Sequence, residues 1–173
     1  MGDTLITVIA IVLAAVLMFV FPLMTMSDRT DDVAQLTVEA ATTEFVDNIR
    51  STGKITQANY NELIETVTST GNTYDVDMVV QVKDANLGNK VSQAQADKIG
   101  ENAYYSVHTS QIEEELKTNG TYYCKEGDIV SASVKNTSQT LSQQLKNFFY
   151  TVTGNDAYTI AAEHSGVVTA NGK

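Results

Sequence analysis

The sequence has one cysteine, one proline and no tryptophan among its 173 residues. Because Cys124 is alone, no disulfide can form within the chain, and a partly buried side chain is favoured over a reactive thiol or an intermolecular bridge. Basic residues are also few, since 11 Lys and Arg stand against 21 Asp and Glu and leave a net charge of −10. A chain this acidic repels polyanions, which argues against nucleic acid or anionic lipid as its partner.

Charge is absent from a long segment near the N-terminus, because no Asp, Glu, Lys or Arg lies between Asp3 and Asp28. A helix over residues 4–26 is about 34 Å long, enough to cross a hydrocarbon core of roughly 30 Å. The segment lacks the basic start and the small-residue cleavage site of a signal peptide. We therefore predict a membrane-spanning helix, in preference to a cleaved signal or a helix buried in a soluble core. Arg29 is the one nearby basic residue, too little to set the orientation.

A helical pattern continues beyond this span without a break. Apolar and small residues recur at intervals of three and four and predict the buried side of an amphipathic helix: Val33, Leu36, Ala40, Thr43, Val46 and Ile49. Gly53 is the natural C-terminal stop, so one helix is predicted from Thr4 to Ser51. Pro22 lies inside it and is expected to kink it, because proline lacks the amide proton and clashes with the preceding turn.

The rest of the chain predicts a small α+β domain, so the chain divides into a long helix over residues 1–53 and a domain over residues 54–173. Residues 73–83 and 128–136 alternate apolar and polar side chains, as strands with one buried face do. A helix is predicted between Thr56 and a cap at Gly71, and a shorter one after Thr109 or Ser110, anchored by Ile112 and Leu116. Residues 84–102 are polar and lack a period, which indicates a loop.

Two more elements complete the prediction. A helix follows Ser138 and ends at Gly154, and residues 157–168 form a last strand. The residues of that helix expected to pack inward are Leu141, Leu145, Phe148, Phe149 and Val152. The whole is a small, mainly antiparallel sheet covered on one face by helices.

No catalytic or metal-binding pattern is found in the sequence. His108 and His164 have no ligand spacing, and each is expected to face solvent. The acidic clusters at residues 28–32, 75–77 and 113–115 match no calcium loop and are expected to be solvated. We therefore predict that the protein is not an enzyme and has no metal, cofactor or small-molecule substrate.

Two functions of different classes remain open. The apolar helix either packs against other subunits, in a structural or assembly protein, or it only anchors an extracytoplasmic binding or sensing module. A plain anchor ends near the membrane surface, often with basic and aromatic residues there, whereas this helix continues for about seven turns. Packing of helices in lipid favours small residues at the contact, and Thr7, Ala10, Ala14 and Ala15 form a candidate strip. Contact of the same residues with lipid is the alternative interpretation.

Three features resemble type IV pilin-like proteins, in particular the TadE-like minor pilins or pseudopilins of Tad (Flp) pilus loci. They are the uncharged segment TLITVIAIVLAAVLMFVFPLM, its amphipathic continuation DDVAQLTVEAATTEFVDNIRSTGKI, and the small α+β domain behind them. Pro22 is similar to the helix-kinking proline of many pilins and joins the candidate assembly residues. The segments KEGDIVSASVKN and AYTIAAEHSGVV look like strands of such domains.

The resemblance implies a single-pass protein of the cytoplasmic membrane, with its domain outside the cell and a role in starting or tipping an extracellular pilus. Its partners would be other pilin-like subunits. Pilins that are processed by prepilin peptidase carry a basic leader ending in Gly and a Glu five residues further on. Here Gly2 has no basic residue before it, and Asp3 is the one acidic residue near the start.

Overall fold

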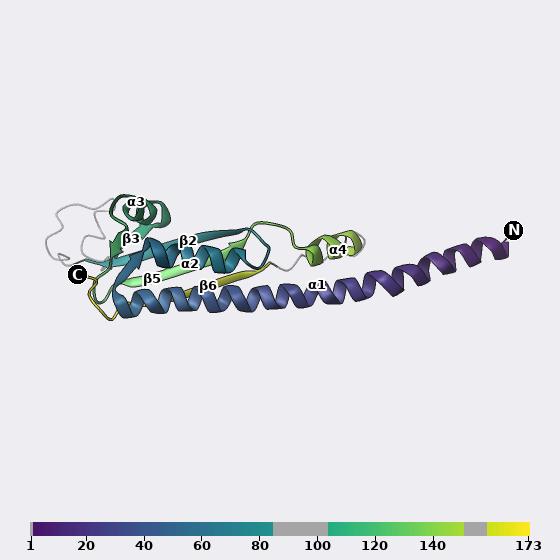
Figure 1. The fold of residues 1–173 in the computed structure, drawn as a ribbon, viewed down its shortest axis with the longest axis horizontal. Coiled ribbons are helices and arrows are strands. Elements are labelled where there is room, and N and C mark those ends of the chain that lie inside the picture. Colours follow the sequence, from purple (N-terminus) through teal and green to yellow (C-terminus); the bar gives the residue numbers. More distant parts are fainter. Residues whose placement is uncertain (1, 85–103, 151–158) are drawn as a thin grey trace, which may run out of the picture.

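The computed structural model describes residues 2–84, 104–150 and 159–173, without the side chains of residues 148–150. Its largest element is α1 (Gly2–Thr52), a helix of 51 residues whose N-terminal half extends far beyond the rest of the molecule (Figure 1). Gly53 ends α1 with a φ of 70° while its amide donates to the Ile49 carbonyl, as predicted. α1 continues through Pro22, and Figure 1 shows the helix as gently curved along its length.

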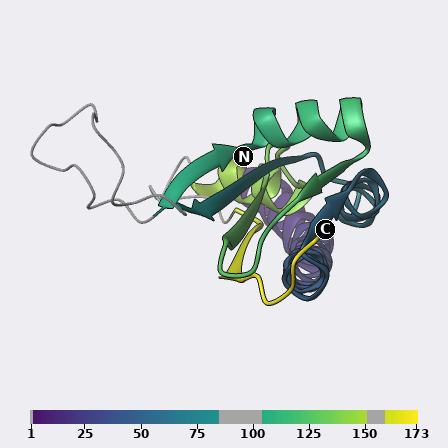
Figure 2. The same ribbon diagram turned by 90° about the vertical axis from the view of Figure 1, so that its left-hand side faces the viewer.

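The domain is an α+β fold, as the sequence predicts. After α1 come β1 (Lys54–Thr56), α2 (Gln57–Thr68), β2 (Tyr74–Lys83), β3 (Tyr104–His108), α3 (Thr109–Asn119), β4 (Thr121–Tyr123), β5 (Ile129–Asn136), α4 (Leu141–Tyr150) and β6 (Ala161–Val167). The main sheet has the order β3-β2-β5-β6, and each neighbouring pair is antiparallel. A small second sheet pairs β1 with β4. Figure 2 shows α1, α2 and α3 on one side of the main sheet.

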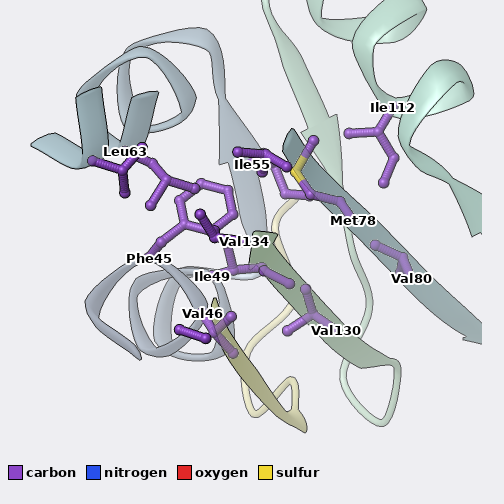
Figure 3. Close-up of a cluster of buried hydrophobic side chains, with 14 of the residues drawn as sticks. Phe45, Val46, Ile49, Ile55, Leu63, Met78, Val80, Ile112, Val130 and Val134 are labelled. Carbon is purple, nitrogen blue, oxygen red and sulfur yellow. The ribbon is translucent and has the colours of Figure 1, made fainter. Parts of the chain in front are cut away.

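The core lies between the main sheet and these helices (Figure 3). On the sheet side of the core, buried side chains come from alternating positions of the two central strands. They are Val76, Met78 and Val80 of β2 and Val130 and Val134 of β5. The helices and the small sheet supply the other side with Phe45, Val46, Ile49, Ile55, Leu63, Val67, Ile112 and Leu116. The second half of α1 is therefore part of the domain core, and the opposite face of the main sheet carries polar residues such as Asp75 and Asp77.

The buried stripe of α1 differs from the predicted one. Val46 and Ile49 are buried as predicted, but Val33 and Leu36 are 63% and 65% exposed. The face that packs on the domain is instead formed by Ala34, Val38, Thr42, Phe45, Val46 and Ile49, in continuation of Ser27 and Asp31. The prediction was wrong here because apolar residues occupy two sides of α1, and only one of them meets the sheet.

Side chains of α1 cover the free edge of β6 at both ends. Gln35 donates from Nε2 to the Ala161 carbonyl at 2.8 Å and accepts from the Ala161 amide at 3.1 Å. Arg50 donates from Nε to the Val167 carbonyl at 3.2 Å, and its own carbonyl accepts from the Thr169 amide. The helix thus satisfies backbone groups at the two ends of this edge strand that no neighbouring strand pairs.

Several boundaries differ from the prediction. Thr56 caps α2, since its hydroxyl accepts from the Asn59 amide, but the C-cap is Ser69, and Gly71 follows in the turn. The N-cap of α3 is His108 rather than Thr109 or Ser110, while Ile112 and Leu116 are buried as predicted.

The last helix also differs. Leu141 is 53% exposed, so the inward packing predicted for it is wrong. The predicted roles of Phe148, Phe149, Val152 and Gly154, and most of the 84–102 loop, lie outside the described residues.

Candidate assembly interface

α1 is long and apolar enough to cross a membrane, by length and composition. Its large apolar side chains in the N-terminal half are exposed, with Leu5, Ile9 and Val12 each more than half accessible. Thr7 and Thr25 lie in this half, and their hydroxyls donate to the carbonyls of Asp3 and Phe21, four residues earlier. Backbone acceptors inside the helix thus satisfy donors that lipid cannot. Thr30, Thr37 and Thr42 make the same bond in the second half of α1, where Thr42 is buried against the domain.

The five candidate assembly residues are all exposed on α1, but they lie on two sides of it. Thr7, Ala10 and Ala14 follow one another at intervals of three and four residues and share a side. Ala15 and Pro22 are seven residues apart and share another side, about 100° around the helix at 100° per residue. The structure therefore brings together three of the five, and places the other two on a neighbouring side.

A continuous apolar surface follows this second side into the domain half of α1. It comprises Phe19, Met26, Val33, Leu36 and Ala40, which we call the exposed strip. Four of these are large side chains with exposed fractions between 63% and 72%. Phe19, Met26, Val33 and Ala40 are spaced by seven residues, the repeat by which helices pack along a shared seam. Arg29 is the one charged residue that falls among them.

The exposed strip lies opposite the face of α1 that packs on the domain, about half a turn of the helix away. Sequence reasoning placed Val33 and Leu36 in the core and so missed the strip. The sequence did contain a signal for the strip, namely the seven-residue interval between the apolar residues Phe19, Met26 and Val33. This interval keeps the three residues on one side of the helix across the end of the predicted span.

Where the span meets the domain, α4 is attached to α1 through polar contacts, which we call the clasp. Thr140 donates from its hydroxyl to Asp31 at 2.7 Å, and Lys146 Nζ lies 2.6 Å from Asp28 Oδ1, which also accepts from Ser142. Thr140 in addition caps α4, since its Oγ1 accepts from the Gln143 amide. The solvated role predicted for the first acidic cluster is therefore wrong for Asp31, which is buried, while Asp28 is partly exposed and also paired.

The two carboxylates of the clasp have opposite electrostatic environments. Hydrogen bonds from Lys146 and then Ser142 lower the pKa of Asp28 below its usual 3.8. Burial raises the pKa of Asp31, against the hydrogen bond from Thr140 and the charge of Lys146. Asp28 thus stabilises the clasp at neutral pH and loses this effect as the pH falls through its lowered pKa. The buried charge of Asp31 destabilises the clasp, and this destabilisation disappears as the pH falls through its raised pKa and the carboxylate becomes protonated.

We expect Asp28→Asn and Asp31→Asn to act differently on α4 at pH 7. Asp28→Asn removes the partner of Lys146 and should speed hydrogen exchange of the α4 amides about two- to fivefold, the effect of a partly exposed ion pair. Asp31→Asn keeps an acceptor for Thr140 and removes a buried charge, so exchange should stay within about twofold or become slower. Hydrogen exchange of the full chain in detergent measures both, and an equal acceleration would contradict the assignment.

The histidines and the cysteine of the described residues form no catalytic or metal-binding arrangement. His108 is exposed, whereas His164 is partly buried against α1 with its Nε2 3.7 Å from Asp47 Oδ1, so the solvent-facing prediction is wrong for His164. Burial raises the pKa of the Cys124 thiol to about 12, which makes it a poor nucleophile. Over residues 2–84, 104–150 and 159–173 no group of three or more His, Cys, Asp or Glu could hold a metal ion.

Comparison with protein-family models, with curated proteins and with solved structures gave no match. The surfaces of the chain itself are therefore the basis for its proposed function.

Proposed function

We propose that the protein is a structural subunit of a bacterial pilus of the Tad or type IV-like kind, either pilin-like or a minor pilin, and that α1 packs against other such subunits. Its domain stands outside the cytoplasmic membrane, and the assembled form is an extracellular fibre. The observation that carries the proposal is the exposed strip, which continues from the span into the domain half of α1.

The exposed strip has no partner within the described part of this chain. The domain covers one side of residues 27–52 and leaves Val33 and Leu36 open to water on the other side. Large apolar side chains in water are stabilised when another surface covers them, at about 25 cal/mol for each Å² buried. A helix that only anchors a domain has no need of an apolar surface beyond the membrane, whereas a helix that joins a bundle uses it along its whole length.

The first half of α1 supports the same function by a different contact. In lipid, apolar helices associate by close packing, which favours small residues on the contacting side. Thr7, Ala10 and Ala14 give α1 such a side, and the Thr7 hydroxyl is already bonded to the Asp3 carbonyl. When a subunit leaves the bilayer for a fibre, neighbouring helices replace the lipid around this half, and the acidic domains lie at the fibre surface.

The direct test is electron microscopy of sheared surface material with a label on the domain. Label along a fibre supports a main subunit, and label at fibre ends supports a minor one. Label confined to membranes would instead favour the membrane-anchored binding or sensing module and overturn the proposal.

We expect Ala14→Leu to reduce the amount of pilus about tenfold while leaving membrane insertion unchanged. A tenfold loss corresponds to about 1.4 kcal/mol at the contact, within the range of a disturbed helix packing. The matched control is Val16→Phe, which adds bulk on the side of α1 opposite Ala14 and off the seven-residue line of the exposed strip. Pilus yield from sheared cells and membrane fractionation measure the two effects, and a normal yield of the Ala14 variant counts against this packing side.

A further inference from the structure

Two charged residues of α1 have no ion-pair partner among the residues that the structure describes. Arg29 lies among the residues of the exposed strip, and Asp3 is the one charged residue of the first half of α1, and both are exposed. Arg50, the other cation of α1, is bonded to Asp47 at 2.6 Å. A charge that is enclosed between apolar helices without a partner is strongly unfavourable. A helix that covers the exposed strip is therefore favoured when it brings an anion to Arg29.

Two series of residues on α1 have the same spacing, with intervals of four, three and four positions. The first series is Asp3, Thr7, Ala10 and Ala14, and the second series is Arg29, Val33, Leu36 and Ala40. At these intervals each series lies along one side of the helix. The first series combines an anion with small side chains, whereas the second combines a cation with two large apolar side chains and an alanine. The two series therefore match in charge and in size when one helix is displaced along a parallel one by 26 positions, or about 39 Å.

At this displacement the members of the two series face each other in order. The aspartate and the arginine lie at the same level and form an ion pair. The next two levels place a small side chain against Val33 and against Leu36, which are 63% and 65% exposed in the single chain. Large side chains that face small ones allow helices to pack closely. Beyond Ala40 the same side of α1 carries the polar Thr43 and Asp47, so the contact covers about three turns.

We propose that residues 29–40 of α1, with the domain half of the exposed strip, bind the first series of a second copy of this chain, in a staggered parallel contact fixed by the ion pair between Asp3 and Arg29. Each copy carries both series, about 39 Å apart along α1 and about 80° apart around it. Contact between two different surfaces leaves one of each free, and the advance along α1 prevents closure into a ring, so the contact continues as an open fibre. The inference rests on the proposed function and adds the register of its subunits.

The stagger distinguishes the fibre from the membrane form. In the membrane, residues 4–26 of every inserted copy lie at the same depth, whereas residues 33–40 lie beyond the predicted span. The first series of one inserted copy therefore cannot reach the second series of another. The contact forms only between copies that are displaced along the membrane normal, as they are in a fibre that leaves the bilayer.

The first test is disulfide cross-linking of fibres made from the full chain with Thr7→Cys and Val33→Cys together. These positions lie at the same level in neighbouring copies, so oxidation should give a ladder of covalent oligomers. The control chain carries Thr7→Cys and Met26→Cys, because Met26 is exposed on the same strip but lies about 10 Å from Val33 along α1. That displacement exceeds the reach of a disulfide, so its ladder should be several-fold weaker. Neither pair can join within one copy, because each is separated along one continuous helix, and Cys124 is buried.

The second test exchanges the two charges. Asp3→Lys and Arg29→Asp should each lower the pilus yield from sheared cells at least about tenfold, because each places like charges at the contact. The chain with both substitutions restores an opposite pair and should return to within about threefold of the unsubstituted yield. Membrane fractionation and protease access to the domain from outside the cell verify that every variant is inserted alike.

The outcomes separate the register from the proposed function. Fibres that give no ladder with the position 7 and 33 cysteines, or an equal ladder with the position 7 and 26 control, would overturn the register and leave the proposed function standing. A normal yield of either single charge variant, or a double variant no better than the single ones, would overturn the ion pair. An equal ladder from isolated membranes would show that the contact needs no displacement and would also overturn the inference. Absence of any fibre from the unsubstituted chain would overturn the inference together with the proposed function.

Discussion

Replacement of Gly53 by alanine is expected to lower the free energy of unfolding by about 3–5 kcal/mol, the range of a strained backbone combined with a clash. Gly53 has a φ of 70°, which strains any residue with a side chain. A Cβ at this position would lie 2.3 Å from the Ala170 carbonyl oxygen and 2.5 Å from the Gly172 amide nitrogen. Both neighbours are backbone atoms, so no side-chain rotation relieves the contact, and the C-terminal segment must move.

That segment is tied to the rest of the fold around Gly53. The Gly53 carbonyl accepts from the Cys124 amide at 2.8 Å, and the Gly172 amide donates to the Cys124 carbonyl at 3.1 Å. The matched control is Gly120→Ala, because Gly120 has a φ of 72° and a Cβ there would meet nothing within 4 Å among the described residues. Its expected cost is about 1 kcal/mol, from the backbone alone. Denaturant unfolding of the full chain in detergent measures the unfolding free energy of both variants. An equal decrease for Gly53→Ala and Gly120→Ala would show that a Cβ at Gly53 does not clash with the C-terminal segment.

Replacement of Ile49 by alanine is expected to cost about 2–5 kcal/mol, the usual range for a buried large-to-small substitution. Ile49 is fully buried and contributes to the core between α1 and the main sheet (Figure 3). The same change at Leu36, which is 65% exposed, should alter the unfolding free energy by less than about 0.5 kcal/mol. Leu36→Ala should nevertheless weaken fibre formation, because it removes a large side chain of the exposed strip.

The pair separates folding from assembly on a single helix. Unfolding of the monomer in detergent gives the first quantity, and pilus yield from cells that carry Leu36→Ala gives the second. A destabilisation by Leu36→Ala as large as that by Ile49→Ala would mean that the predicted stripe, with Leu36 in the core, was correct after all.

The elements with a strong internal pattern could be predicted from the sequence. The strands at 74–83 and 129–136 alternate regularly, and α1 is both long and strongly apolar. The cap at Thr56 follows from a hydroxyl that can reach an amide three residues later. Each of these depends on neighbours in the chain.

Elements that depend on distant partners could not be predicted in the same way. β1 and β4 have three residues each and are held by pairing such as Lys54 with Tyr123, so neither has a period of its own. β3 was missed beside a polar stretch, because its pairing with β2 decides its structure.

The candidate interface shows the same limit. The small residues of the span stand out in the sequence, but α1 has apolar residues on two roughly opposite sides, and the neighbours Val33 and Ala34 belong to different ones. Only the position of the sheet shows which side becomes core and which becomes the exposed strip. Likewise, the orientation of α4 depends on Asp28 and Asp31, more than 100 residues earlier in the chain.

The bonds between α1 and β6 determine how the protein would bear a mechanical load. α1 runs alongside β6, and its contacts with Ala161 through Gln35 and with Val167 through Arg50 lie at opposite ends of that strand (Figure 1). Tension along α1 therefore pulls on both attachments in shear at once, instead of peeling them apart in turn. In a subunit held by α1, a pulling force on the helix would therefore reach the domain while α1 and β6 stay attached to each other.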